Sequence, residues 1–324
     1  MNNIFKCPNC NKLIKCLIPD VCPNCGCHIK DENGIFIFTP KGNMEIDSEN
    51  KYIGFDVIAP NYDSSRERSL DSKEGEIVGK LIGAGNVILE IGAGTGYHSI
   101  PMAKTGCKVI AGDISINMLH ILISKMNDNL KENLLPCKMD SYSLPLADKS
   151  IDAVLIDHVF HLIENPEVVL NEIKRVVKPN GYFINILYSG QVLSSDEEVT
   201  RYQEINLKIA KYYESAIKRN DVKLLKRFGW IGQKDQQYNL NKLFPSCNVI
   251  EDDTLVKKQT ITIKDELNNY RNRVHVNQAI VDREINNKII DEIEDKLYDE
   301  FGKENVNRKF DTLEKTSIQL FTVI

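Results

Sequence analysis

From about residue 52 onward, short apolar runs alternate with longer stretches in which apolar residues recur every three or four positions. The short runs predict buried strands at 86–91, 107–112, 134–139, 150–156 and 181–188. The periodic stretches between them predict helices; one of them, PEVVLNEIKRVVK, begins with Pro166 at a first-turn position. Strands that alternate with helices in this way indicate a mostly parallel sheet with helices on both faces.

Beyond residue 188 the pattern changes to one long amphipathic stretch. Apolar residues at 202, 205, 209, 212, 213 and 216 fall on one face of a helix, which predicts packing on the core. The C-terminal segment TSIQLFTVI predicts a final strand that returns to the sheet. No run of 18 apolar residues occurs, and MNNIFKCPNC lacks the apolar core of a secretion signal. We therefore expect a cytoplasmic protein without a membrane span.

The nine cysteines form two groups. Cys107, Cys137 and Cys247 stand in apolar surroundings and are expected to behave as small buried hydrophobic residues. The other six lie within the first 27 residues, which include CPNC at 7–10 and CPNCG at 22–26. A reducing cytosol disfavours a disulfide framework, so this second group indicates a metal site.

Two tight cysteine pairs are typical of a structural zinc ribbon, in which four thiolates surround one ion. Gly26 and Asn11 follow the two pairs, and both residue types tolerate the positive φ that such a turn requires. The predicted Zn²⁺ ligands are Cys7, Cys10, Cys22 and Cys25, and the alternatives for the fourth ligand are Cys16, Cys27 and His28. We expect this ribbon and a polar linker to occupy residues 1–50, with IFIF at 35–38 completing a hairpin.

The charge distribution gives little support to nucleic-acid binding. The formal net charge is -5, and residues 1–50 carry five Lys against six Asp or Glu. The one clearly basic stretch, 201–234, has nine Lys or Arg against three acids, and 282–300 is its acidic counterpart, with eight acids against three bases. A nucleic-acid partner would therefore depend on a local patch.

Glycine recurs at every second position in VILEIGAGTGYHS, which spans 87–99 and joins a predicted strand to a predicted helix. The dinucleotide fingerprint is not met, because Tyr97 stands where its third glycine would fall. Glycines at this turn let the backbone approach a nucleoside closely. Asp113 ends the next strand, where an acid accepts ribose hydroxyls, and Asp140 follows the third strand, where it can meet the amine of adenine. These positions predict a nucleoside pocket.

Three segments carry a family resemblance: VILEIGAGTGYHS, VIAGDISINML, and the run from MDSYSLPLADKS to VVKPNGYF. Over roughly residues 52–190 the chain resembles class I S-adenosylmethionine-dependent methyltransferases, and most of all the type 11 group that includes ubiquinone and menaquinone methylases. The resemblance implies an α/β fold: a Rossmann-like, doubly wound, mostly parallel seven-stranded sheet in a domain spanning 51–324, with a helical lid at about 190–250. It also implies S-adenosylmethionine as the cofactor.

The resemblance assigns residues to three parts of the cofactor: the methionine part, the adenosine part and the region of the methyl group. The methionine part would be held by Glu90, Gly92, Ala93, Gly94 and Gly96. The adenosine part would meet Asp113 at the ribose and Ile114, Met118, Asp140 and Ser141 at the adenine. The region of the methyl group would involve Asp157, and Tyr62 matches a family tyrosine that closes over the cofactor. Asn180 departs from the family pattern, which usually has glycine there.

His158 and His161 follow the fourth predicted strand, where the resembled family places groups near the transferring methyl. Imidazole titrates near neutrality, so either side chain is a candidate for taking a proton from the acceptor, and packing within HVFHLI is the alternative. The sulfonium already activates the methyl group, so alignment in a water-poor site carries most of the chemistry. Aromatic lid residues serve either as pocket lining or as core: Tyr202, Tyr212, Tyr213, Phe228 and Trp230.

These features favour a small-molecule methyl acceptor. No D-P-P-Y or N-P-P-F follows the fourth strand, which argues against exocyclic-amine methylation of nucleobases, and Cys137 lies within the third strand, which argues against a cytosine-C5 nucleophile. The main alternative is a zinc-ribbon ribosomal-RNA guanine methyltransferase, because some enzymes of that group also join an N-terminal cysteine zinc domain to this fold, and the basic stretch at 218–227 could meet phosphates. A non-catalytic cofactor- or partner-binding module is the second alternative, and the glycine spacing disfavours an NAD-dependent oxidoreductase. The acceptor atom and the oligomeric state stay open.

Overall fold

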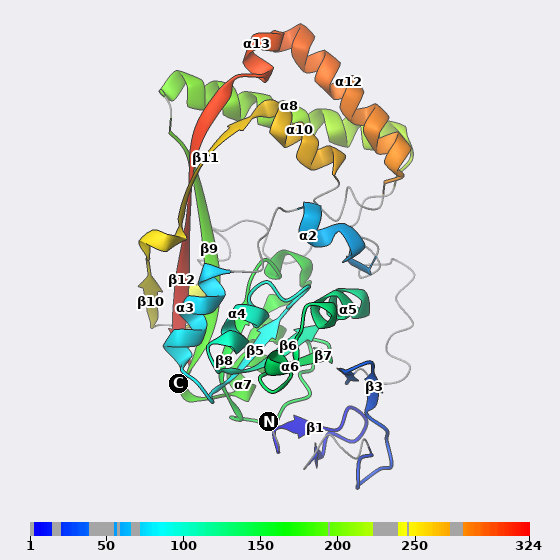
Figure 1. Cartoon of the computed structure of the whole chain (residues 1–324), viewed down its shortest axis with the longest axis vertical. Coiled ribbons are helices and arrows are strands. Elements are labelled where there is room, and N and C mark those ends of the chain that lie inside the picture. Colours follow the sequence, from blue (N-terminus) through cyan, green and yellow to red (C-terminus); the bar gives the residue numbers. More distant parts are fainter. Residues whose placement is uncertain are drawn as a thin grey trace.

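The computed structural model describes residues 3–14, 21–38, 55–56, 59–65, 72–193, 195–222, 239–244, 246–272 and 281–324. In this part of the chain a large sheet with helices on both faces lies between a helical layer and the cysteine-rich N-terminal segment (Figure 1). None of the helices described is long and apolar enough to cross a membrane.

Seven strands form the centre of the large sheet, in the order β7-β6-β5-β8-β9-β12-β10. The five parallel strands are β5 (Val87–Ile91), β6 (Lys108–Asp113), β7 (Leu134–Lys138), β8 (Ile151–Ile156) and β9 (Val177–Val192). β12 (Lys309–Thr322) runs antiparallel to β9 and to β10 (Cys247–Ile250). The predicted mostly parallel, seven-stranded sheet is thus confirmed, and three further strands extend it.

Side chains alternate between the two faces of the sheet, as the period of a strand requires. Leu89 and Val154 lie in one apolar cluster with helix α7 (Pro166–Val176), whereas Ile88 and Leu155 lie in a second cluster with α3 (Lys73–Ile82) and α4 (Ser99–Lys104). Helices therefore cover both faces. The periodic stretch at 115–130, between the second and third predicted strands, forms two helices, α5 (Ile116–Ser124) and α6 (Asp128–Lys131), because Asn127 caps the second one.

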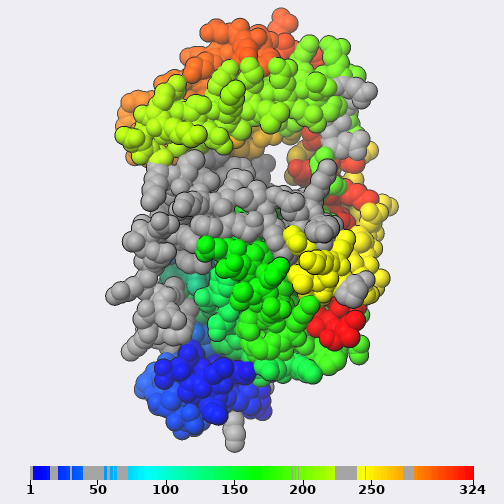
Figure 2. All heavy atoms as spheres, turned by 180° about the vertical axis from the view of Figure 1, so that it is seen from behind, coloured from blue at the N-terminus to red at the C-terminus, as the bar shows by residue number. Residues whose placement is uncertain are grey.

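The N-terminal segment is joined to the edge of this sheet. It contains β1 (Phe5–Lys6), β2 (Leu13–Ile14), β3 (Lys30–Glu32) and β4 (Ile35–Ile37). The predicted hairpin is β3–β4, and β4 pairs parallel with β7, with Phe36 opposite Cys137. Phe5 is buried in the same cluster as Leu146 and bridges to it, so the segment shares an apolar core with the large sheet. Figure 2 shows this segment, in blue, at the opposite end of the molecule from the helical layer.

Among the described residues, four helices form that layer, the helical cap: α8 (Asp196–Arg219), α10 (Ile263–Arg271), α12 (Arg283–Phe301) and α13 (Lys303–Val306). Ile205, Ile209 and Tyr213 of the predicted stripe are buried in its core. The cap extends beyond the predicted lid range, because β9, β11 (Val256–Thr262) and β12 are long enough to carry the chain to the cap and back. Phe228 and Trp230 lie outside the described residues.

Candidate functional site

The glycine loop lies between β5 and α4, and each of its glycines has a different neighbourhood. Gly92, Gly94 and Gly96 all have positive φ, at 76°, 53° and 89°. A Cβ on Gly92 would lie 2.3 Å from Cγ2 of Val159, and one on Gly96 would lie 2.9 Å from Cγ of Leu122. No atom of the described residues lies within 4 Å of a Cβ on Gly94. Gly92 and Gly96 therefore lie in close packing, whereas Gly94 faces open space among the described residues.

Asp113 is held against this loop by backbone amides. The N–H of Gly94 donates to its Oδ2 over 2.7 Å, and the N–H of Ser115 donates to its Oδ1 over 2.8 Å. Burial raises the pKa of the Asp113 carboxyl group, and these amides oppose that effect. Ile114 is half-buried and Met118 is buried, both directly after Asp113 along the chain. The predicted nucleoside residues at 94, 113, 114 and 118 thus lie around one strand end.

Tyr62 belongs to α2 (Tyr62–Ser65), a short helix fastened to the glycine loop. Its neighbour Asp63 accepts a hydrogen bond of 2.6 Å from Oγ1 of Thr95 and pairs with Lys125. Lys125 in turn donates to the carbonyl of Thr95 over 2.9 Å. These contacts hold α2 beside the loop, so Tyr62 lies in the neighbourhood that the resemblance implies.

Glu90 is the buried acid of β5. Only 3% of its surface is exposed, and the hydroxyl of Ser99 donates to its carboxylate. Burial raises the pKa of Glu90 to about 7, against the opposing charge of His98 and the hydrogen bond from Ser99. A carboxyl group that titrates this close to neutrality can respond to a positively charged ligand.

Asp157 directly follows β8 and accepts two hydrogen bonds at the same oxygen. Nε2 of His98 lies 3.0 Å from its Oδ2, and the hydroxyl of Tyr188 donates to that oxygen over 2.9 Å. Burial lowers the pKa of His98, but the hydrogen bond and charge of Asp157 outweigh it and raise that pKa overall. The sequence pattern does not single out His98 or Tyr188; the only signal is an imidazole directly after the glycine loop.

The two candidate histidines differ in their surroundings. His158 is exposed, has φ of 53°, and stacks its ring on that of Tyr188 with centroids 4.7 Å apart. His161 is half-buried in the short helix η2 (Phe160–Leu162). The structure thus brings the His158 ring into contact with Tyr188, whose hydroxyl is bonded to Asp157.

Asp140 and Ser141 follow β7, next to the end of β6. Asp113 is opposite Lys138 in the sheet, which places Asp140 two residues beyond that pair. Oδ1 of Asp140 accepts from the N–H of Tyr142 over 2.9 Å, and both Asp140 and Ser141 are half-buried. They therefore occupy the same edge of the sheet as Asp113.

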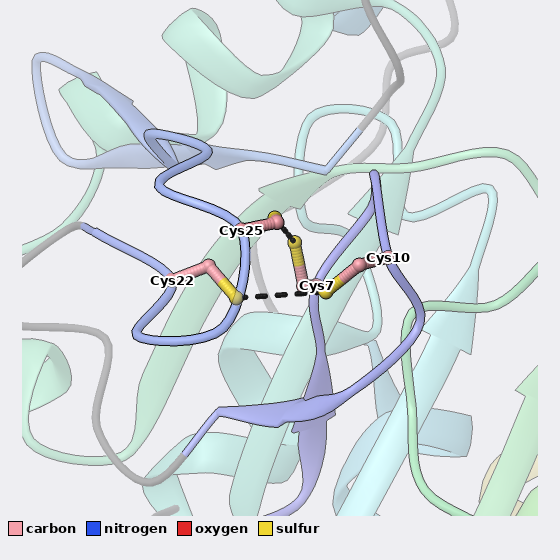
Figure 3. Close-up of side chains that lie close together, drawn as sticks. All are labelled: Cys7, Cys10, Cys22 and Cys25. Carbon is pink, nitrogen blue, oxygen red and sulfur yellow. Dashed lines mark hydrogen bonds between the residues drawn. The ribbon is translucent and has the colours of Figure 1, made fainter.

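The four predicted zinc ligands converge at the N-terminal end, as Figure 3 shows. Their sulfur atoms all lie within 4.8 Å of one another, with Cys7 and Cys25 3.6 Å apart and Cys10 and Cys22 3.7 Å apart. Thiolates bound tetrahedrally at 2.3 Å would be about 3.8 Å apart, so the set fits Zn²⁺. These cysteines form no disulfide.

The backbone around the cysteines has the predicted turns. Asn11 and Gly26 have φ of 57° and 72°, and their N–H groups donate to the carbonyls of Cys7 and Cys22 over 2.9 Å in each case. Cys27 lies outside the group, with its thiol directed to the carbonyl of His28. Cys16 falls outside the described residues.

The basic and acidic stretches pair with each other within the cap. Lys208 of α8 forms an ion pair with Glu300 of α12, and Arg219 lies 3.4 Å from Glu292. Tyr212 also donates to Glu300, over 2.6 Å. Lys208 and Arg219 are thus paired with acids of the same chain, whereas residues 223–234 of the basic stretch lie outside the described residues.

Comparisons with known proteins agree with this fold. Residues 89–185 match the sequence model of a family described as a methyltransferase domain. The chain is 33% identical over 135 residues to the demethylmenaquinone methyltransferase of Renibacterium salmoninarum, and 30% identical over 144 residues to that of Paenarthrobacter aurescens. These alignments cover 40% and 43% of this chain, and 55% of each relative. The chain thus spans about half the length of the curated relatives it matches.

Among solved structures, the YcgJ protein of Bacillus subtilis is similar, with 14% identity, a TM-score of 0.47, and coverage of 77% of this chain and 99% of that one. The family match and the curated relatives confirm the resemblance to class I S-adenosylmethionine-dependent methyltransferases of the ubiquinone and menaquinone type. Residues 89–185 are thus similar to a methyltransferase domain.

Proposed function

We propose that this protein transfers the methyl group of S-adenosylmethionine to a small organic acceptor. The observation that carries the proposal is the contact of Gly94 with Asp113, at a point where the loop has open space and the carboxylate is fixed by two amides. A nucleoside needs this combination of a bare backbone and an oriented acid.

Each chemical group of S-adenosylmethionine would meet a complementary side chain in this arrangement. Asp113 would accept the ribose hydroxyls, the neighbouring Ile114 and Met118 would flank the adenine, and Asp140 would meet the adenine edge. Glu90 offers a buried carboxyl group to the positively charged methionine part. When bound, S-adenosylmethionine supplies an activated methyl group, so the residues of this chain need mainly to orient the acceptor and exclude water.

The acceptor side would lie at the ends of β8 and β9, where Asp157, His158 and Tyr188 lie together. His158 is the exposed imidazole of this group and our candidate for taking a proton from the acceptor, with His161 as the second candidate. The names of the relatives make a reduced quinone one acceptor to test.

The four N-terminal cysteines are proposed to hold one structural Zn²⁺. Four thiolates complete a tetrahedral shell and leave no open position for catalysis. The pairing of β4 with β7 suggests that the metal braces the sheet edge next to Asp140.

The function is tested by incubating the purified protein with methyl-labelled S-adenosylmethionine, a desalted lysate and its restored small-molecule fraction. RNA, protein and low-mass products are then separated. Label in the low-mass fraction is expected and gives the acceptor mass; a demethylated quinol is added in a parallel reaction. Label in RNA would overturn the proposal in favour of the ribosomal-RNA alternative.

A further inference from the structure

Both ring nitrogens of His98 are engaged by buried groups. Nδ1 lies 2.7 Å from Oγ of Ser72, and Nε2 lies 3.0 Å from Oδ2 of Asp157. Ser72 donates its only hydroxyl proton to Glu74 over 3.0 Å and accepts from the N–H of Gly75. Ser72 thus links Nδ1 of His98 to the carboxylate of Glu74.

The ring of His98 is enclosed by acids, which favour its protonated form. Only 2% of the surface of His98 and 8% of that of Glu74 are exposed, and the Asp157 side chain is 6% exposed. Burying a cation is costly unless it is paired and hydrogen-bonded, and here one carboxylate is bonded directly and a second through Ser72. Such an arrangement leaves His98 and Asp157 little rotational freedom.

The network continues from Asp157 to the surface. The oxygen that accepts from His98 also accepts from Tyr188, and the ring of Tyr188 stacks on the exposed ring of His158. His158 has φ of 53°, a conformation that costs free energy for a residue other than glycine and persists where its surroundings fix it. The contacts thus connect the glycine loop to the ends of β8 and β9.

We propose that His98 is a positioning residue for methyl transfer: it fixes the Asp157 carboxylate and, through it, the Tyr188 phenol and the His158 ring that face the acceptor. The inference rests on the proposed function. It assigns His98 no contact with the acceptor and no proton transfer.

The test compares two replacements of His98 that each keep one hydrogen-bonding position. The amide nitrogen of a glutamine can reach the place of Nε2 and donate to Asp157, whereas an asparagine can reach only the place of Nδ1. His98→Gln should keep kcat within about threefold, and His98→Asn should lower it about 100-fold, because misplacing a reacting group by 1 Å has an effect of this size. The Kd for S-adenosylmethionine should not change in either variant. Equal kcat in both variants would overturn the proposal, since a purely structural role predicts a change in Tm alone.

A second measurement requires neither a methyl acceptor nor turnover. The imidazole signals of His158 in ¹⁵N-histidine-labelled protein should move in His98→Asn and in Tyr188→Phe, and should stay in place in His98→Gln. Unmoved signals in His98→Asn would show that His98 does not position this group, whatever the activity. The signals could move as expected while the wild-type protein transfers no label to RNA, protein or low-mass products. The proposed function would then be wrong, but the positioning role of His98 would be supported.

Discussion

The backbone N–H of Gly94 donates to Oδ2 of Asp113 over 2.7 Å and so ties the loop after β5 to the end of β6. The other oxygen of Asp113 is held by the N–H of Ser115. The carboxylate therefore has a fixed direction before any ligand binds, and its remaining lone pairs are available to hydroxyl groups.

Replacing Asp113 with alanine should weaken S-adenosylmethionine binding about 10- to 100-fold, because hydrogen bonds to a charged group contribute about 1.5–3 kcal/mol. Titration calorimetry measures the change in Kd. Asp113→Asn keeps one acceptor oxygen for the amides and should give an intermediate affinity. Wild-type affinity in the alanine variant would remove Asp113 from the cofactor site.

The glycine loop allows a matched pair of substitutions. Gly94→Ala adds a methyl group that meets no described atom, whereas Gly92→Ala places it 2.3 Å from Val159. Both add a positive-φ cost of roughly 1 kcal/mol, but only Gly92→Ala adds a core clash. We expect Gly94→Ala to lose cofactor affinity about tenfold with a small change in Tm, because the new methyl group occupies ligand space. Gly92→Ala should mainly lower Tm, and thermal melts with and without S-adenosylmethionine separate the two effects.

Glu90 gives the unfolding free energy a defined pH dependence. Its pKa rises from 4.5 to about 7 on folding because of burial. Between these pH values the folded protein keeps a proton that the unfolded chain has lost, so the free energy of unfolding falls as pH increases. The contribution is present below pH 4.5 and is lost by about pH 7, which amounts to about 3 kcal/mol.

Glu90→Gln removes this titration while its amide oxygen can still accept from Ser99. The ligand-free variant should therefore gain stability over the wild type as pH rises from 4.5 to 7, as measured by urea unfolding at several pH values. Glu76→Gln is a control, because Glu76 is an exposed acid of α3 paired with Lys73 and Lys80. A constant difference between Glu90→Gln and the wild type across this range would contradict the assignment.

Local sequence patterns predict the central strands well. The expected strand at 86–91 is β5 (Val87–Ile91), because its flanking turn residues and apolar run are neighbours in the chain. Asn180, which replaces the family glycine, has φ of 63° and so supplies the same turn. The split between α5 and α6 is also local, but a continuous apolar period conceals the cap at Asn127.

Contacts between distant segments are not visible in such patterns. Nothing near 35–38 indicates that β4 will pair with β7, a hundred residues away. His98 was missed for the same reason, because its partners Ser72 and Asp157 come from α3 and β8. The ion pair of Lys208 with Glu300 is a similar case. The sequence shows that the stretches 201–234 and 282–300 have opposite charge, but it does not show that they are in contact.

We expect removal of the metal to weaken cofactor binding, because β4 connects the N-terminal segment to β7 beside Asp140. Phe38 donates its N–H to the carbonyl of Lys138 over 2.9 Å, and Asp140 follows two residues later. Purified protein should carry close to one zinc per chain, and Cys7→Ser or Cys25→Ser should lose it. Chelation should lower Tm by on the order of 10 °C, because metal binding is coupled to folding. It should also weaken S-adenosylmethionine binding severalfold.

Cys27→Ser is the matched control, because Cys27 lies beside the cluster and directs its thiol to a backbone carbonyl instead. This variant should keep its zinc, its Tm and its cofactor affinity. Zinc retained in both Cys7→Ser and Cys25→Ser would refute the ligand assignment. If the metal is lost while cofactor affinity stays at the wild-type value, the zinc stabilises only the N-terminal segment and the pairing of β4 with β7 transmits nothing to Asp140.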